Sequence, residues 1–130
     1  MIKGFTTETE PLSEYERVVL VPAFIRGLIP RVGKKMAVTN KHIVSSMKGS
    51  YKVSDARVRK VINYIRVNDL VPCLIATSDG YYIAESEKEL KDYEESLQGR
   101  EDAIRAVRLS INRQRKQKYG GQQQDLFNGK

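Results

Sequence analysis

Val58-Arg-Lys-Val-Ile-Asn-Tyr-Ile-Arg66 is the stretch that decides the fold of this 130-residue chain. Its apolar residues recur at the i, i+3, i+4, i+7 spacing that places side chains on one side of a helix. These residues are Val58, Val61, Ile62 and Ile65. The long polar side chains that point away from this side are Arg59, Lys60 and Asn63. Ser54 is a suitable N-cap, so the pattern predicts a helix from there to about Asn68, with a buried stripe and an exposed cationic face.

Two further helices are predicted upstream. Thr39 is a typical N-cap for a helix over residues 40–47, which Lys48-Gly49-Ser50 ends. Ser13 is the expected N-cap of an earlier helix over residues 14–29, in which Pro22 should produce a kink because it has no backbone N–H. The residues expected to be buried are Ile43, Val44 and Met47 in the later helix and Val18, Val21, Ile25 and Leu28 in the earlier one.

A short hairpin is expected after the central helix. Residues 72–77 and 81–84 are β-prone runs separated by Ser78-Asp79-Gly80, and Asp-Gly is a strong hairpin signal. Ala37 and Val38 are expected to form a short first strand.

A long C-terminal helix is predicted over residues 85–118. Ser86 and Glu89 have the spacing of a capping box at its start. Its apolar residues form a heptad seam over about three repeats. The seam consists of Leu90, Leu97, Ile104 and Ile111, with Tyr93 and Val107 at intermediate positions. Gly99 and Arg100 interrupt the seam, and two arrangements stay open: the helix packs on its own domain, or two chains form a homodimer through residues 90–111.

Charge is distributed in segments along the chain. The net charge is +7 and the pI is near 9.6, which favours a polyanionic partner. From Arg26 to Arg66 there are eleven Lys and Arg against one acid, Asp55. From Glu85 to Asp102 the balance reverses to −5, and residues 103–118 then contain six bases and no acid.

The composition predicts neither an enzyme nor a cofactor-binding protein. His42 is the only histidine and is expected to be partly exposed. The chain has no second His or second Cys to complete a transition-metal site. Cys73, between Pro72 and Leu74, is expected to be a small buried apolar residue, and a single cysteine fits a reducing compartment. No glycine-rich phosphate loop is present, since Gly120-Gly121 precedes no Lys-Ser/Thr.

A membrane protein is also not expected. The longest apolar run, Val18 to Ile25, is too short to cross a bilayer, and the N-terminus has no signal-peptide pattern. These features predict a cytoplasmic protein.

Two motifs resemble a known fold family. Ala37-Val-Thr-Asn-Lys-His-Ile43 and Val58-Arg-Lys-Val-Ile-Asn-Tyr-Ile-Arg66 are similar to the winged helix-turn-helix superfamily over residues 37–84, and residues 12–82 resemble small winged-helix proteins of bacteriophages and prophages. The resemblance implies a mainly α fold with a small β-hairpin (α+β), followed by the long helix, and double-stranded DNA as partner. The residues expected to contact DNA are Lys41, Lys52, Arg57, Arg59, Lys60, Asn63 and Tyr64, supplemented by Lys34 and Lys35.

A second resemblance lies near the C-terminus. Gln123-Gln-Asp-Leu-Phe127 is similar to the pentapeptide Gln-Leu-Ser/Asp-Leu-Phe, with which bacterial DNA-processing proteins bind the replicative sliding clamp. It departs from that pattern at Gln124, where the family has Leu. The resemblance implies that Leu126 and Phe127 fill an apolar pocket and that Gln123 and Asp125 make polar contacts. A tail without a partner, and a Leu-Phe pair folded back on the domain, are the alternatives.

The sequence thus predicts four segments: a flexible lead-in (1–12), a winged helix-turn-helix (13–84), the long helix (85–118) and a flexible tail (119–130). The expected function is DNA binding in a phage or bacterial replication or transcription-regulatory system. The alternative is a protein-interaction adaptor or inhibitor, whose charges imitate or block a nucleic-acid surface.

Overall fold

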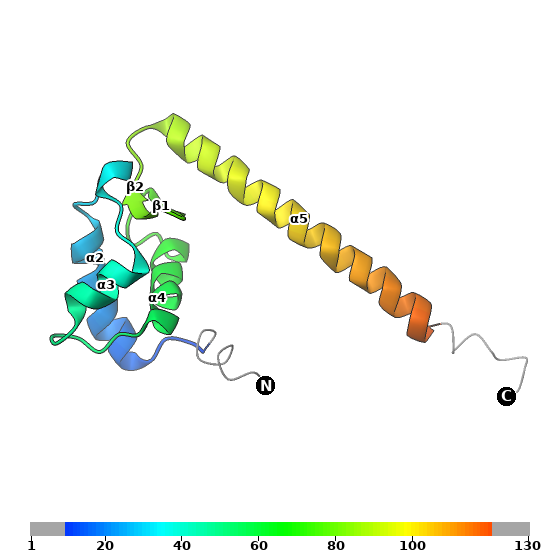
Figure 1. The fold of residues 1–130 in the computed structure, drawn as a ribbon, viewed down its shortest axis with the longest axis horizontal. Helices are drawn as coiled ribbons and strands as arrows, with labels where there is room; N and C mark the ends of the chain where they lie inside the picture. Colours follow the sequence, from blue (N-terminus) through cyan, green and yellow to red (C-terminus); the bar gives the residue numbers. More distant parts are fainter. Residues whose placement is uncertain (1–9, 121–130) are drawn as a thin grey trace, which may run out of the picture. The chain divides into compact units, whose positions relative to one another are not determined.

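The first element of the fold is a helix with one wide turn. The computed structural model describes residues 10–120, and residues 14–28 of it are helical (Figure 1). The π-helical turn η1 (Glu16–Leu20) leads directly into α2 (Val21–Leu28), and the Val21 N–H donates to the carbonyl of Glu16, five residues back. Pro22 follows at once and has no N–H to donate to the carbonyl of Val18. The wide turn therefore lies where the α-helical hydrogen bonds are interrupted.

A reciprocal cap begins this helix. The Ser13 Oγ accepts the Glu16 N–H at 3.1 Å, and the Ser13 N–H donates to Glu16 Oε1 at 2.8 Å. Both groups of a capping box are thus satisfied, and the predicted N-cap at Ser13 is confirmed.

The buried face of the same helix differs from the predicted one. Val18 is 57% exposed, whereas Leu20 and Phe24, which the α-helical spacing did not select, are buried. The reason is the π turn, which adds a residue to one turn and so rotates the stripe that faces the core. Val21 and Leu28 are buried as predicted.

The next segment contains a short 3₁₀ turn, η2 (Lys34–Met36), and α3 (Asn40–Met47). Thr39 is the N-cap of α3, and its Oγ1 accepts the His42 N–H at 3.1 Å, as predicted. The predicted strand at Ala37 and Val38 is wrong. Only two residues separate η2 from the Thr39 cap, and Val38 makes a single antiparallel bridge with Tyr81.

The helix α4 (Asp55–Val67) matches the predicted central helix. Ser54 is its N-cap residue, although the Ser54 side chain makes no capping hydrogen bond. At the other end Asp69 adopts a left-handed φ of 57°, and the Leu70 N–H donates to the Ile65 carbonyl at 3.0 Å. This is the geometry of a Schellman motif, which satisfies carbonyls at the helix end.

The predicted hairpin is present as β1 (Leu74–Thr77) and β2 (Gly80–Ile83), an antiparallel pair in which Thr77 lies opposite Gly80. Gly80 has a φ of 118°, and a Cβ at this position would lie 2.6 Å from the carbonyl oxygen of Val38. Glycine is therefore required here both by the backbone conformation and by the close approach of the neighbouring chain.

Cys73 corrects another prediction, because it is exposed rather than buried. Its φ is 63°, and it follows Pro72 in the turn that enters β1. Proline followed by a left-handed residue is the pattern of a type II turn, which here presents the thiol outward.

The core is built around α4, which contacts both α2 and α3 (Figure 1). The four residues of the predicted stripe, Val58, Val61, Ile62 and Ile65, are all at most 1% exposed. Buried residues of α2, α3 and the hairpin complete the same cluster: Phe24, Leu28, Ile43, Leu74 and Tyr81. The fold is thus mainly α with a small β-hairpin, as predicted.

The long helix α5 (Glu87–Tyr119) has 33 residues, passes through Gly99 without interruption, and has no buried residue. Ser86 Oγ accepts the Glu89 N–H at 3.2 Å, and the Glu89 carboxylate accepts the Glu85 N–H rather than that of Ser86. The capping box therefore differs from the usual one in the backbone N–H that the Glu89 side chain accepts.

The contacts divide the chain into two units, with the boundary between Leu90 and Lys91. Residues 1–9 and 121–130, which include most of the predicted lead-in and tail, lie outside the described residues.

Candidate nucleic-acid interface

The side of α4 that faces away from the core carries the predicted polar residues. Arg59 and Asn63 are exposed and Lys60 is partly exposed. Arg66, which is not among the predicted residues, is partly exposed and lies in line with Arg59, because seven residues make almost two complete turns. The seven-residue spacing between Arg59 and Arg66 is the sequence signal that could have identified Arg66.

Arg57 has a different role from the predicted one. Its Nε donates to Glu16 Oε2 and its Nη2 donates to Glu16 Oε1, both at 2.7 Å, and Nη2 also donates to the Pro11 carbonyl at 3.0 Å. The two side chains are only 13% and 11% exposed. The structure therefore assigns Arg57 to an internal ion pair and removes it from the expected DNA-contacting set.

The ion pair alters the acid–base properties of both groups. The hydrogen bonds from Arg57 lower the pKa of the Glu16 carboxyl, although burial acts in the opposite direction. The hydrogen bonds to Glu16 likewise raise the pKa of Arg57. Both groups are thus held in their charged forms.

Tyr64 is also turned toward the protein. It lies seven residues after Arg57, and hence on the same side of α4. Its side chain is half-buried and packs against the hydrophobic core, so Tyr64 helps to anchor the helix rather than to extend its exposed face.

The exposed side of α3 offers a second group of hydrogen-bond donors. A shallow hollow on its surface is lined by Thr39, Lys41, His42, Ser45 and Ser46. Lys41, predicted to contact phosphate, is exposed, and so are His42 and both serines. Amine and hydroxyl donors of this kind suit the phosphate oxygens of a nucleic-acid backbone.

The segment between α3 and α4 carries Lys52, the other predicted phosphate contact. Its side chain is exposed, and its backbone N–H donates to the Tyr15 Oη at 2.9 Å. This hydrogen bond ties the segment to the N-terminal helix.

The hairpin contributes little positive charge. Residues 74–83 contain no Lys or Arg, and the acid in its turn, Asp79, pairs with Lys34 at 3.5 Å. Both side chains of this pair are more than half exposed, so solvent screens the interaction. The cationic side chains near the hairpin therefore come from η2, as Lys34 and Lys35.

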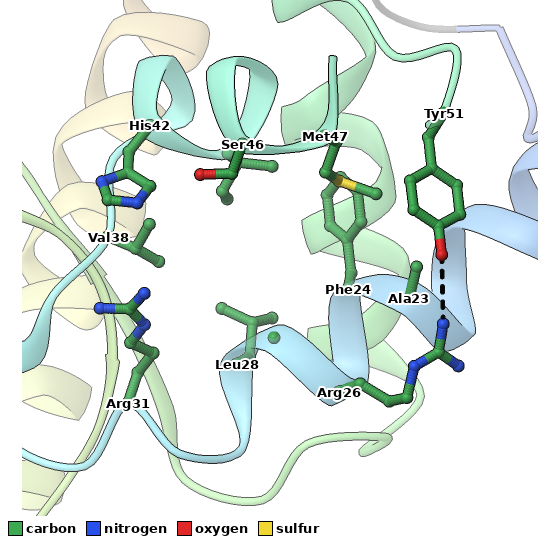
Figure 2. Close-up of a pocket in the computed structure, with 12 residues that line it drawn as sticks. Ala23, Phe24, Arg26, Leu28, Arg31, Val38, His42, Ser46, Met47 and Tyr51 are labelled. Atoms are coloured by element: carbon green, nitrogen blue, oxygen red, sulfur yellow. Dashed lines mark hydrogen bonds between the residues drawn. The ribbon is translucent and has the colours of Figure 1, made fainter. Parts of the chain in front are cut away.

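A hollow between α2 and α3 was not expected from the sequence. It has a volume of about 230 Å³, and Figure 2 shows apolar side chains, Phe24, Leu28, Val38 and Met47, among those that line it. Arg31 and His42 lie at one end of the hollow, and at the other end Arg26 Nη2 donates to Tyr51 Oη at 3.4 Å. The hollow thus has an apolar lining and cationic groups at its margin.

Within residues 10–120, no three His, Cys, Asp or Glu side chains are grouped in a way that could hold a metal ion. In the same range, no helix combines the length and the apolar character needed to span a bilayer. The predicted clamp-binding residues, Gln123, Asp125, Leu126 and Phe127, lie outside the described residues.

No protein-family model, curated protein or solved structure matches this chain. The geometry and chemistry described above are therefore the basis for assigning a function.

Proposed function

We propose that this chain binds double-stranded DNA through the exposed face of α4, as a non-enzymatic winged-helix protein of a phage or bacterial replication or regulatory system. The observation that carries the proposal is the contrast between the two sides of α4. Its apolar stripe is at most 1% exposed, while Arg59 and Asn63 on the other side are open to solvent. A helix anchored in this way can enter the major groove with its donors directed at base edges.

The proposal divides the contacts by chemistry. Asn63 suits adenine, because its amide can donate to N7 and accept from the N6 amino group, and Arg59 suits guanine, because its guanidinium can donate to both O6 and N7. Lys41 and Lys52 supply phosphate contacts, which fix position without reading sequence. Arg66 extends the α4 row by almost two turns of the helix.

Salt dependence of binding tests the proposal directly. We expect the affinity for a labelled duplex, measured by fluorescence anisotropy, to fall steeply between 50 and 200 mM salt. Each phosphate contact contributes a slope of about −0.9 in log K against log salt, so four contacts predict a loss of about a hundredfold. A duplex affinity that does not change with salt would contradict the proposal.

A protein-interaction adaptor is the second candidate, and the hairpin favours it. The hairpin has no Lys or Arg side chain with which to contact phosphate, and Asp79 places an acid in its turn. Capture of partners from a bacterial lysate, with and without nuclease, separates the two functions. A DNA binder loses its associated proteins after nuclease treatment, whereas an adaptor retains its protein partner.

We propose further that the C-terminal tail binds the bacterial sliding clamp. The support is the sequence Gln123-Gln-Asp-Leu-Phe127, which resembles the clamp-binding pentapeptide at four of five positions. Its two large apolar side chains suit a hydrophobic pocket on such a partner. This activity is separable from DNA binding, because it depends on a different part of the chain.

A further inference from the structure

The apolar seam of α5 is exposed to solvent. Leu97 is 37% exposed, Ile111 56%, Val107 63% and Ile104 70%. These residues repeat at heptad positions on one side of a 33-residue helix, and this spacing is that of a seam which packs against another helix. A row of exposed Leu and Ile side chains at this spacing calls for a covering surface.

Charge along one edge of the seam identifies that surface. The residues four positions after each seam residue are Glu94, Glu101, Arg108 and Arg115, all of them exposed. Two acids are thus followed by two bases on a single edge. The opposite edge is nearly neutral, with Ser96, Ala103, Ser110 and Gln117 after Glu89.

From this pattern we propose that α5 pairs with α5 of a second copy of this chain in antiparallel orientation. In an antiparallel pair the charged edge of one helix runs along the charged edge of the other, in the reverse direction. Glu94 of each copy then faces Arg108 of the other, and Glu87, one heptad earlier on the same edge, faces Arg115. Glu101 lies beside the two-fold axis, next to Glu101 of the other copy. Ion pairs at these flanking positions set the orientation of paired helices.

A parallel pair lacks this complementarity. Its flanking contacts join opposite edges of the two helices, so that Glu89 of one copy meets Glu94 of the other. The acidic first half of each helix also lies beside the acidic first half of its partner, and the basic halves likewise meet. Like charges placed together in this way are unfavourable.

The seam itself defines a register for the antiparallel pair. Placing the two-fold axis near residue 102 sets Leu97 opposite Val107 and Tyr93 opposite Ile111 of the second copy. Leu90 then lies opposite Gln114. Ile104, beside the axis, lies opposite Arg100, whose methylene stem can cover it. The two apolar layers on each side of the axis cover each other, and the exposed row becomes an interface.

The arrangement goes beyond the proposed DNA binding and does not depend on it. With the axis near residue 102, the two Glu87 residues lie roughly 45 Å apart along the paired helices, at about 1.5 Å per residue. The two N-terminal units are therefore attached at opposite ends of the pair. A DNA target of such a dimer would have two separated half-sites.

Sedimentation of the full-length protein tests association. We expect a species of twice the 14.8 kDa chain mass at tens of micromolar. A monomer at a hundred micromolar would overturn the proposal. This result is independent of DNA affinity, which is measured on the same sample.

Charge reversal tests the orientation. Glu94→Arg should weaken the dimer at least tenfold, and adding Arg108→Glu should restore it, because the antiparallel pairs then re-form with reversed signs. The matched control is Glu95→Arg, which makes the same change of charge away from the seam and should leave the dimer intact. Circular dichroism verifies that each variant retains its helix. Failure of the double variant, Glu94→Arg with Arg108→Glu, to recover dimerisation contradicts the proposal.

Disulfide capture provides a second measure of orientation. In a Cys73→Ser background, Leu90→Cys alone should not cross-link. An equimolar mixture of the Leu90→Cys chain and a Gln114→Cys chain should form a mixed disulfide. Efficient cross-linking of the Leu90→Cys chain to itself would indicate a parallel pair and overturn the proposal.

Discussion

Glu16 and Arg57 lie 41 residues apart in the chain and form a doubly hydrogen-bonded ion pair with two N···O distances of 2.7 Å. The same Glu16 carboxylate accepts the Ser13 N–H, and the Glu16 carbonyl closes the π turn. One residue therefore links the N-terminal cap, the wide turn and the first turn of α4. Arg59 lies only two residues beyond Arg57, so the position of the exposed face depends on this link.

Loss of the Glu16 charge should destabilise the domain. Glu16→Gln leaves the buried Arg57 guanidinium without its counter-charge, and we expect a loss of about 2 kcal/mol in the free energy of unfolding at neutral pH. Urea denaturation monitored by circular dichroism measures this value. Glu14→Gln, an exposed position two residues earlier, is the matched control and should change stability by less than about 0.5 kcal/mol.

The same pair predicts how stability depends on pH. The pKa of Glu16 is lower in the folded protein than its ordinary value, so the contribution of the pair is complete above the ordinary value and is lost as pH falls through the lowered one. The stability difference between wild type and Glu16→Gln should therefore narrow under acidic conditions. A difference that stays constant from neutral pH to pH 3 would show that the charge of Glu16 is not what stabilises the fold.

Removing two cations from the exposed face of α4 should reduce DNA binding. Arg59→Ala with Lys60→Ala is expected to weaken the affinity at least tenfold at fixed salt and to leave the fold intact, because both side chains lie opposite the buried stripe. Arg17→Ala with Arg26→Ala removes the same charge from the N-terminal helix and serves as the control. Equal losses in the two double variants would mean that only the net charge matters.

Gly80 should tolerate no side chain. In Gly80→Ala the new Cβ would meet the Val38 carbonyl oxygen at 2.6 Å, on a backbone with a φ of 118°. We expect a loss of roughly 2 kcal/mol or more in unfolding free energy, from strain and from displacement of the neighbouring segment. Gly49→Ala is a useful comparison, because Gly49 also has a positive φ but has no atom within 4 Å of the added Cβ. Its loss should be smaller.

The tail should act separately from the proposed DNA-contacting face of α4. Leu126→Ala with Phe127→Ala is expected to abolish binding to the sliding clamp and to leave DNA affinity unchanged, since burial of each side chain contributes roughly 1.5–3 kcal/mol. Gln124→Leu should strengthen the same contact, because it restores the apolar residue usual in the motif. Absence of binding between the wild-type tail peptide and its host's clamp at a hundred micromolar would exclude this partner.

The central helix could be predicted because its information is local. Helical periodicity alone predicts the buried stripe of Val58, Val61, Ile62 and Ile65. The cap at Thr39 follows from the preference for Thr at helix N-caps. The hairpin was likewise predictable from its Asp-Gly pair and the β-prone runs around it.

The remaining features depend on contacts that lie far apart in sequence. Ser13 and Glu16 have the spacing of a capping box, yet nothing nearby shows that the carboxylate also binds Arg57. The position of Arg57 on the helical wheel predicts that its side chain points outward. The wheel carries no information about Glu16, the acid from the N-terminal helix that binds Arg57. A regular α-helical period predicts that Val18 is buried, and this prediction is wrong because the π turn interrupts that period.

That π turn has an evolutionary consequence. A π turn contains one residue more than the α turn that it replaces, so η1 corresponds to an insertion in a regular helix. Deleting the exposed Val18 would remove the extra residue, but it would rotate everything before the deletion by about 100° around the helix axis. Glu16 would then point away from Arg57. In related chains, loss of this extra residue should therefore coincide with replacement of both members of the Glu16–Arg57 pair, a covariation that an alignment of such chains would reveal.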